Sequence, residues 1–124
     1  MFEDPGEDEW VALWNNYRLE MVKNLFLNDE RVTYFSSEKQ GLIKGIDNLV
    51  EHHRGFGFIE GGKDTGNKLW LEDVEIEEFG DVTVVKADWI FQRKSPDKQQ
   101  RGPVTIVYVK EDRHRIAHAQ FSNY

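Results

Sequence analysis

Three stretches near the end of the chain decide the fold: DVTVVKADWIFQRKS (81–95), RGPVTIVYVKED (101–112) and RHRIAHAQFSNY (113–124). Each stretch is rich in Val, Ile, Thr and aromatic residues, which favour β-strands. A polar turn follows the first stretch and a tight turn follows the second. The pattern predicts a β-meander, in which consecutive strands pair antiparallel, and the residues before position 81 must cover its apolar surface.

The first of these strands is apolar on both faces. One face holds Val85, Ala87, Trp89 and Phe91, and the other holds Val82, Val84 and Ile90, interrupted by Lys86 and Asp88. A sheet with one face in water shows a cleaner alternation of apolar and polar residues. Because the available helices can cover only one face, we expect a second copy of the chain to cover part of the other. The sequence therefore predicts a homodimer formed through the sheet face.

The position of Asp88 depends on which face of the sheet points inward. With Trp89 and Phe91 inside, Asp88 lies on the expected dimer side, where it would pair with a basic residue such as Lys86 or Arg93 of the partner copy. With the two faces inverted, Asp88 becomes the carboxylate of the pocket and the best candidate for a general base. The sequence leaves both alternatives open.

The N-terminal residues predict a helix. Apolar residues recur every three or four positions from Trp10 to Leu25, which indicates an amphipathic helix with Tyr17 on its apolar face. Asn15-Asn16 has low helix propensity, so a bend or two shorter helices is the alternative.

Three further elements are expected before the meander. RVTYFS (31–36) predicts a short strand, the apolar spacing over 46–54 predicts a short helix, and 69–79 predicts another strand. The alternation in the last of these changes phase near Glu72-Asp73, which indicates a bulge or a strong bend. No internal repeat or linker interrupts the chain, so residues 1–124 are expected to form one domain.

The segment GFGFIEGGKDTGNK (55–68) holds five of the ten glycines. It does not match a phosphate-binding loop, because Gly62-Lys63 is followed by Asp64 instead of Ser or Thr. One interpretation is a mobile connection without a functional role. The other is a lid, in which Phe56 and Phe58 close over a cavity and the glycines provide hinge freedom.

Composition narrows the class of protein. Asp and Glu number 23 against 16 Lys and Arg, and the net charge of −7 would repel a nucleic-acid backbone. The absence of cysteine excludes disulfides and thiolate metal sites. Neighbouring His52 and His53 on a helix point about 100° apart and make a poor metal site. We therefore expect no metal, no cofactor and no nucleic-acid partner.

The chain also has no apolar run long enough to cross a bilayer, and its acidic N-terminus does not resemble a signal peptide. We expect a cytoplasmic protein without a membrane partner.

Four segments resemble the nuclear transport factor 2-like superfamily, in particular its SnoaL-like branch. NDERVTYF (28–35) is similar to the aspartate-rich turn into the first strand of that branch, and GIDNLV (45–50) is similar to its glycine-led short helix. ADW (87–89) stands where the long third strand carries an aromatic residue, and RIAHAQFS (115–122) resembles the closing strand. Two positions depart from the pattern: His114 replaces the usual Trp, and Gln120 replaces a frequent second His.

The resemblance implies an α+β fold of the cystatin-like kind. In it a strongly curved mixed, mostly antiparallel sheet wraps around N-terminal helices and leaves a conical pocket. The superfamily includes steroid isomerases, dehydratases, polyketide cyclases, hydrolases and non-catalytic association domains, so the fold does not select a function. We expect a protein that binds a small hydrophobic ligand, with or without proton-transfer chemistry. The alternative is a non-catalytic homodimeric association or ligand-sensing module.

Candidate site residues come from the last strand and the first helix. Alternation along the strand places Ile116, His118 and Gln120 on one face, so both polar residues line the pocket if Ile116 faces the helices. His118 could then act as a general base, or simply be a hydrogen-bonded core histidine. The resemblance to isomerases implies that Tyr17 donates a hydrogen bond to a developing oxyanion. The expected ligand-contacting residues are Trp14, Tyr17, Phe56, Phe58, Trp89, Phe91, His118 and Gln120.

Overall fold

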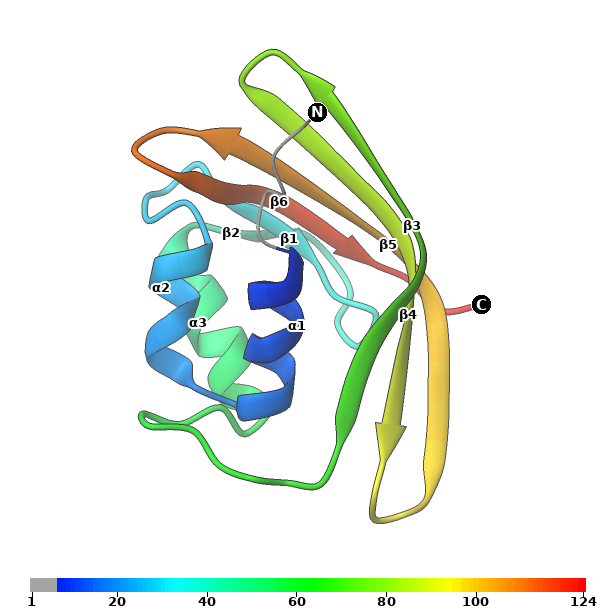
Figure 1. Cartoon of the computed structure of the whole chain (residues 1–124). Coiled ribbons are helices and arrows are strands. Elements are labelled where there is room, and N and C mark those ends of the chain that lie inside the picture. Colours follow the sequence, from blue (N-terminus) through cyan, green and yellow to red (C-terminus); the bar gives the residue numbers. More distant parts are fainter. Residues whose placement is uncertain (1–6) are drawn as a thin grey trace.

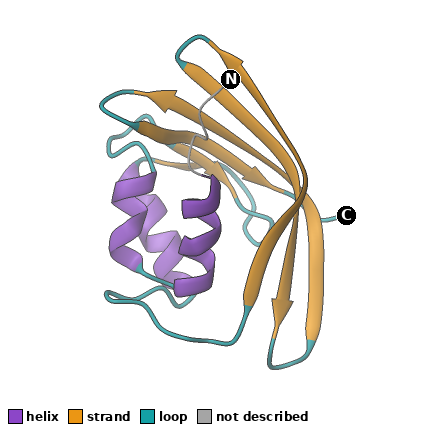
Figure 2. Ribbon diagram, viewed as in Figure 1, coloured by secondary structure: helices purple, strands orange, loops and turns teal. Residues whose placement is uncertain are grey.

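The structure is a computed structural model that describes residues 7–124, and it shows helices packed on the inner face of a curved six-stranded sheet (Figure 1, Figure 2). The helical elements are α1 (Glu7–Asn16), the 3-10 helix η1 (Leu19–Met21), α2 (Val22–Leu25) and α3 (Ile46–Gly55). The strands are β1 (Thr33–Phe35), β2 (Ile43–Lys44), β3 (Lys68–Phe79), β4 (Val82–Arg93), β5 (Lys98–Lys110) and β6 (His114–Phe121). The predicted α+β fold is confirmed. Within the described part of the chain, no helix has the length and apolarity needed to span a bilayer.

The strands lie in the order β2-β1-β6-β5-β4-β3. β3, β4, β5 and β6 pair antiparallel in sequence order, so the predicted meander is confirmed. β1 pairs parallel with β6, placing Thr33 opposite His118 and Phe35 opposite Gln120. This one parallel pair makes the sheet mixed. The short strand β2, which the sequence did not predict, pairs antiparallel with β1 at the edge.

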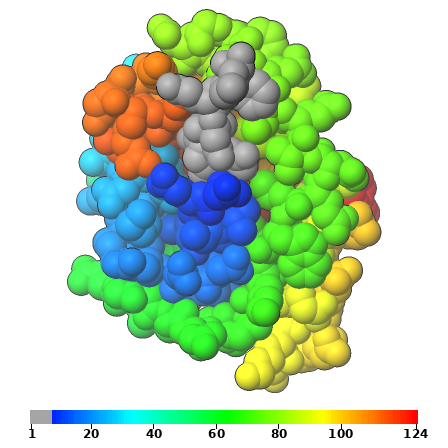
Figure 3. Space-filling model, in the orientation of Figure 1, coloured from blue at the N-terminus to red at the C-terminus, as the bar shows by residue number. Residues whose placement is uncertain are grey.

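The N-terminal helical segment is broken after Asn16. Tyr17 adopts a left-handed φ of 56°, so α1 ends and the chain turns before η1 and α2. This is the broken form expected from Asn15-Asn16, in place of one continuous helix. α1 lies between α2 and β3 on the surface (Figure 3).

The side chain of Asn15 ties the end of α1 to the start of β3. Its Oδ1 accepts a hydrogen bond from the Leu69 N–H at 2.7 Å, and its Nδ2 donates to the Leu69 carbonyl at 3.1 Å. The amide of Asn15 thus satisfies both backbone groups of one strand residue, as a neighbouring strand would. Asn15 therefore fixes where the end of α1 lies relative to β3.

Two β-bulges bend the sheet. The first lies in β3 between Glu72 and Glu75, and it confirms the bulge indicated by the change of phase. The second lies in β6: Tyr108 pairs with Ile116 and Val107 pairs with His118, so the register skips one residue. A bulge increases local twist and also reverses the face on which the following side chains lie.

The loop 56–67 after α3 is fastened to the broken helical segment. The Ile59 N–H donates to the Tyr17 carbonyl at 3.0 Å, the Leu19 N–H donates to the Ile59 carbonyl at 2.9 Å, and the Lys63 N–H donates to the Asn16 carbonyl at 2.9 Å. Phe58 is fully buried, with its ring centroid 5.1 Å from that of Trp14 and 4.9 Å from that of Tyr17. The expectation that Phe58 acts as a lid residue is therefore wrong, because it belongs to the core between the helices and the sheet.

Candidate ligand-binding site

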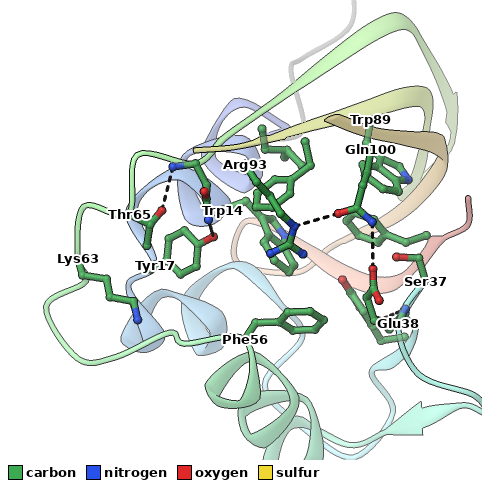
Figure 4. A pocket seen from close by; sticks show the side chains of 16 residues that line it. Trp14, Tyr17, Ser37, Glu38, Phe56, Lys63, Thr65, Trp89, Arg93 and Gln100 are labelled. Atoms are coloured by element: carbon green, nitrogen blue, oxygen red, sulfur yellow. Dashed lines mark hydrogen bonds between the residues drawn. The ribbon is translucent and has the colours of Figure 1, made fainter. Parts of the chain in front are cut away.

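A cavity with a volume of about 260 Å³ lies between the end of α1, the loop after α3 and the inner face of the sheet (Figure 4). Its apolar and aromatic wall is formed by Trp14, Tyr34, Phe56, Leu69, Trp89, Phe91 and Phe121. Its polar lining is formed by Tyr17, Ser36, Ser37, Glu38, Lys63, Thr65, Asn67, Arg93 and Gln100. Since an apolar cavity of about 150 Å³ is enough to hold benzene, this one is large enough for a single ring with a short substituent.

Five of the residues expected from the sequence line this cavity: Trp14, Tyr17, Phe56, Trp89 and Phe91. Trp89 is buried, and its indole Nε1 donates to the Ser122 carbonyl at 2.9 Å, which fixes the ring in the wall. The structure thus places Trp89 and Phe91 on the inner face, and the inverted assignment of the two faces is wrong.

His118 and Gln120 lie on the outer face of the sheet, so the expectation that they line the pocket is wrong. The bulge before His118 breaks the simple alternation from Ile116, and Ala119 and Phe121 take the buried positions instead. His118 Nδ1 lies 2.8 Å from the Thr33 hydroxyl oxygen on the neighbouring strand. Burial lowers the pKa of His118, and a hydrogen bond with the backbone of Thr33 partly offsets this. Its position on the outer face excludes direct contact with a molecule in the cavity.

Asp88 also lies on the outer face. It accepts a hydrogen bond from the hydroxyl of Tyr124 and lies 3.9 Å from the Arg101 guanidinium. Both partners belong to the same chain, so Asp88 already has the opposite charge that we had expected a partner copy to supply. It is not a carboxylate of the cavity.

The Tyr17 hydroxyl is positioned as a hydrogen-bond donor toward the cavity. The Asn67 Oδ1 accepts from the Lys94 backbone N–H at 3.0 Å, which orients the amide so that its Nδ2 donates to the Tyr17 oxygen at 3.1 Å. Because the tyrosine oxygen already accepts one bond, its own O–H remains available to a ligand.

A chain of three polar side chains crosses the mouth of the cavity (Figure 4). Arg93 Nε donates to Gln100 Oε1 at 3.1 Å, and Gln100 Nε2 lies 3.4 Å from Glu38 Oε1, at the outer limit of a hydrogen bond. None of the three was predicted from the sequence to line the cavity. Alternation would have found Arg93, which follows Val85, Trp89 and Phe91 on the same face, whereas nothing in the sequence places the loop residue Glu38 beside it.

Burial keeps two titratable groups next to the cavity neutral. Burial lowers the pKa of His53 to about 4, although the hydrogen bond with the Leu49 carbonyl at 2.9 Å favours the charged form. Burial also raises the pKa of Tyr34. His53 is enclosed by aromatic rings, among them Trp14 at 5.6 Å and Phe58 at 5.1 Å between centroids. It is a core residue.

No protein-family model and no curated protein matches the chain. Solved structures do. A nuclear transport factor 2-like superfamily protein from Salmonella enterica is 20% identical over 95% of this chain and 85% of its own, with a TM-score of 0.79. The S. rosetta CaMKII hub is 22% identical over 95% of this chain and 91% of its own, with a TM-score of 0.76. A ketosteroid isomerase candidate from Parabacteroides distasonis is 14% identical over 98% of this chain and 89% of its own, with a TM-score of 0.74.

Proposed function

We propose that this chain, which has the nuclear transport factor 2-like fold, is a SnoaL-like protein that binds a small molecule with an apolar ring in its cavity. The supporting observation is the cavity itself, in which an aromatic wall faces a set of polar side chains that could orient a bound molecule. The isomerase and dehydratase candidates among the similar structures are consistent with a small-molecule role for this fold.

Proton transfer, if the bound molecule undergoes it, would use residues of the cavity wall. Tyr17 supplies the hydrogen-bond donor. Glu38 is the one carboxylate among the described residues that line the cavity, and it takes the place that the sequence had suggested for His118. A base must reach the proton that it removes, so His118 on the outer face is replaced in this scheme.

The binding proposal is tested by blocking the mouth of the cavity. Gln100 lines the cavity, while its neighbour Gln99 is exposed on the opposite face of β5. We expect wild-type protein and Gln99→Trp to bind the neutral probes benzamide or 2-phenylacetamide saturably in a protein-detected NMR titration. Gln100→Trp should bind neither, since the indole fills the mouth. Equal binding by both variants would place the probe elsewhere and contradict the proposal.

A second proposal, assembly of two copies through the outer face of the sheet, rests on a different observation. No helix of residues 7–124 covers this face, and it carries half-buried Val84, Val107 and Val109 as well as Phe35, which is 38% exposed. The S. rosetta CaMKII hub and the association domains among the similar structures carry names that refer to assembly.

Assembly predicts a mass twice the 14.6 kDa of the chain by light scattering at micromolar concentration. Val107→Lys, which puts a charge in the centre of the proposed contact, should shift the mass to that of one chain. Ala12→Lys on the exposed side of α1 is the matched control and should leave the dimer intact. A wild-type mass of 14.6 kDa would refute assembly.

A further inference from the structure

Arg93 differs from every other arginine of the chain. The other six form ion pairs: Arg18 with Glu20, Arg31 with Asp29, Arg54 with Glu51, Arg101 with Glu72 and Asp88, Arg113 with Glu9, and Arg115 with Asp112. Arg93 has no carboxylate partner among residues 7–124. It is also the one arginine in the lining of the cavity.

The guanidinium of Arg93 is held in place by contacts that leave its end free. Its Nε donates to Gln100 at 3.1 Å, and the group lies 5.2 Å from the ring centroid of Phe91. Its terminal NH1 and NH2 groups donate to no acceptor in the part of the chain that the structure describes. Arg93 is half-buried at the edge of an aromatic wall, where an unpaired charge is less well solvated than in water. A planar, oriented fork of N–H donors of this kind matches the two oxygens of a carboxylate.

The charge of the lining is the reverse of that of the whole chain. Acidic residues outnumber basic ones by 23 to 16 overall, yet among residues 7–124 the lining holds two cations, Lys63 and Arg93, and one acidic residue, Glu38. Lys63 Nζ lies 5.9 Å from the Tyr17 ring centroid and also lacks a carboxylate partner among the described residues. The cavity is therefore locally positive on a protein that otherwise repels anions.

Glu38 does not neutralise Arg93. Gln100 lies between them, with its oxygen used by Arg93 and its nitrogen facing Glu38. Glu38 is exposed, so water screens its charge more than that of half-buried Arg93. The neutral amide of Gln100 thus holds the guanidinium of Arg93 in position without neutralising its charge.

We infer that the ligand is a ring-bearing monocarboxylate, with its ring against the aromatic wall and its carboxylate on the terminal nitrogens of Arg93. This inference rests on the proposed binding function and specifies its ligand class. The distance from the wall residue Phe91 to Arg93 is short, two residues along β4, so an acid with its carboxylate directly on the ring or a few bonds away fits both contacts.

The test compares acids with their neutral amides: benzoate, 2-phenylacetate and 3-phenylpropanoate against benzamide, 2-phenylacetamide and 3-phenylpropanamide. For at least one pair the acid should bind wild-type protein at least about tenfold more tightly, as expected for a charge-assisted hydrogen-bonded pair. Arg93→Gln should abolish this preference, so that the ratio of acid affinity to amide affinity measured in that variant falls to about one. Arg93→Lys should restore part of it, because the charge returns without the planar fork.

Arg101→Gln, on the outer face, is the matched control and should keep the full preference for acids. Amides that bind as tightly as acids, or a preference that survives Arg93→Gln, would overturn the carboxylate assignment while the binding function stands. If neither acids nor amides bind, the proposed function falls, and this inference falls with it.

Discussion

Replacing Gly102 with alanine is expected to destabilise the protein by about 3 kcal/mol or more. A Cβ at this position would lie 1.9 Å from the Ser122 carbonyl oxygen and 2.9 Å from the Asn123 Cα. Both contacts are with backbone, which cannot rotate away as a flexible side chain would. The same Ser122 carbonyl accepts the hydrogen bond from Trp89, so the substitution also displaces a wall of the cavity.

Urea unfolding monitored by circular dichroism measures the decrease in the free energy of unfolding caused by Gly102→Ala. Gly55→Ala at the end of α3 is the control, because a Cβ there meets no atom within 4 Å, and its stability should stay within about 1 kcal/mol of wild type. If Gly102→Ala were as stable as Gly55→Ala, the segment after β6 would not pack against β5 as described.

Truncating Phe58 to alanine is expected to destabilise the protein by about 3–5 kcal/mol, the range for a buried Phe that leaves a cavity. Its ring is enclosed by Trp14, Tyr17 and His53. A lid residue would behave differently, since its removal would alter ligand exchange and leave the free energy of unfolding nearly unchanged.

The neighbouring residue supplies the control for Phe58. Ile59 is 47% exposed, and its contacts with the broken helix are made by backbone groups that alanine retains. Ile59→Ala should therefore cost about 1 kcal/mol or less by the same urea titration. Equal losses for the two variants would show that Phe58 is not part of the core.

The meander was predictable because its strands are long and rich in Val, Ile, Thr and aromatic residues, which favour β-strands. The break after Asn16 was one of two alternatives, which the low helix propensity of Asn15 and Asn16 suggested. The bulge at Glu72-Asp73 was visible as a shift in alternation. The bulge in β6 was not, because Ile116, His118 and Gln120 alternate regularly, and only the pairing with β5 reveals the skipped residue.

The candidate site also has a part that the sequence predicts and a part that it does not. Its aromatic wall was predictable, since Trp14, Trp89 and Phe91 lie on apolar faces of regular elements. Polar residues such as Glu38 and Asn67 come from loops, whose course depends on tertiary contacts that sequence patterns do not encode. Arg93 was predictable as a residue of the inner face, because strand alternation continues past Phe91. Arg93 was instead expected on the dimer side as a partner for Asp88, and this is wrong because Arg93 lines the cavity on the inner face.

The parallel pairing of β1 with β6 gives the chain a particular order of assembly. β1 is synthesised 85 positions before its partner residues His118, Ala119 and Gln120. The Leu27 N–H after α2 donates to the Ile116 carbonyl at 2.8 Å, so this hydrogen bond also cannot form before β6 is synthesised. Until β6 is synthesised, the N-terminal helices have no completed sheet on which to pack. The cavity, whose wall includes Phe121 of β6, therefore forms only after β6 has been synthesised.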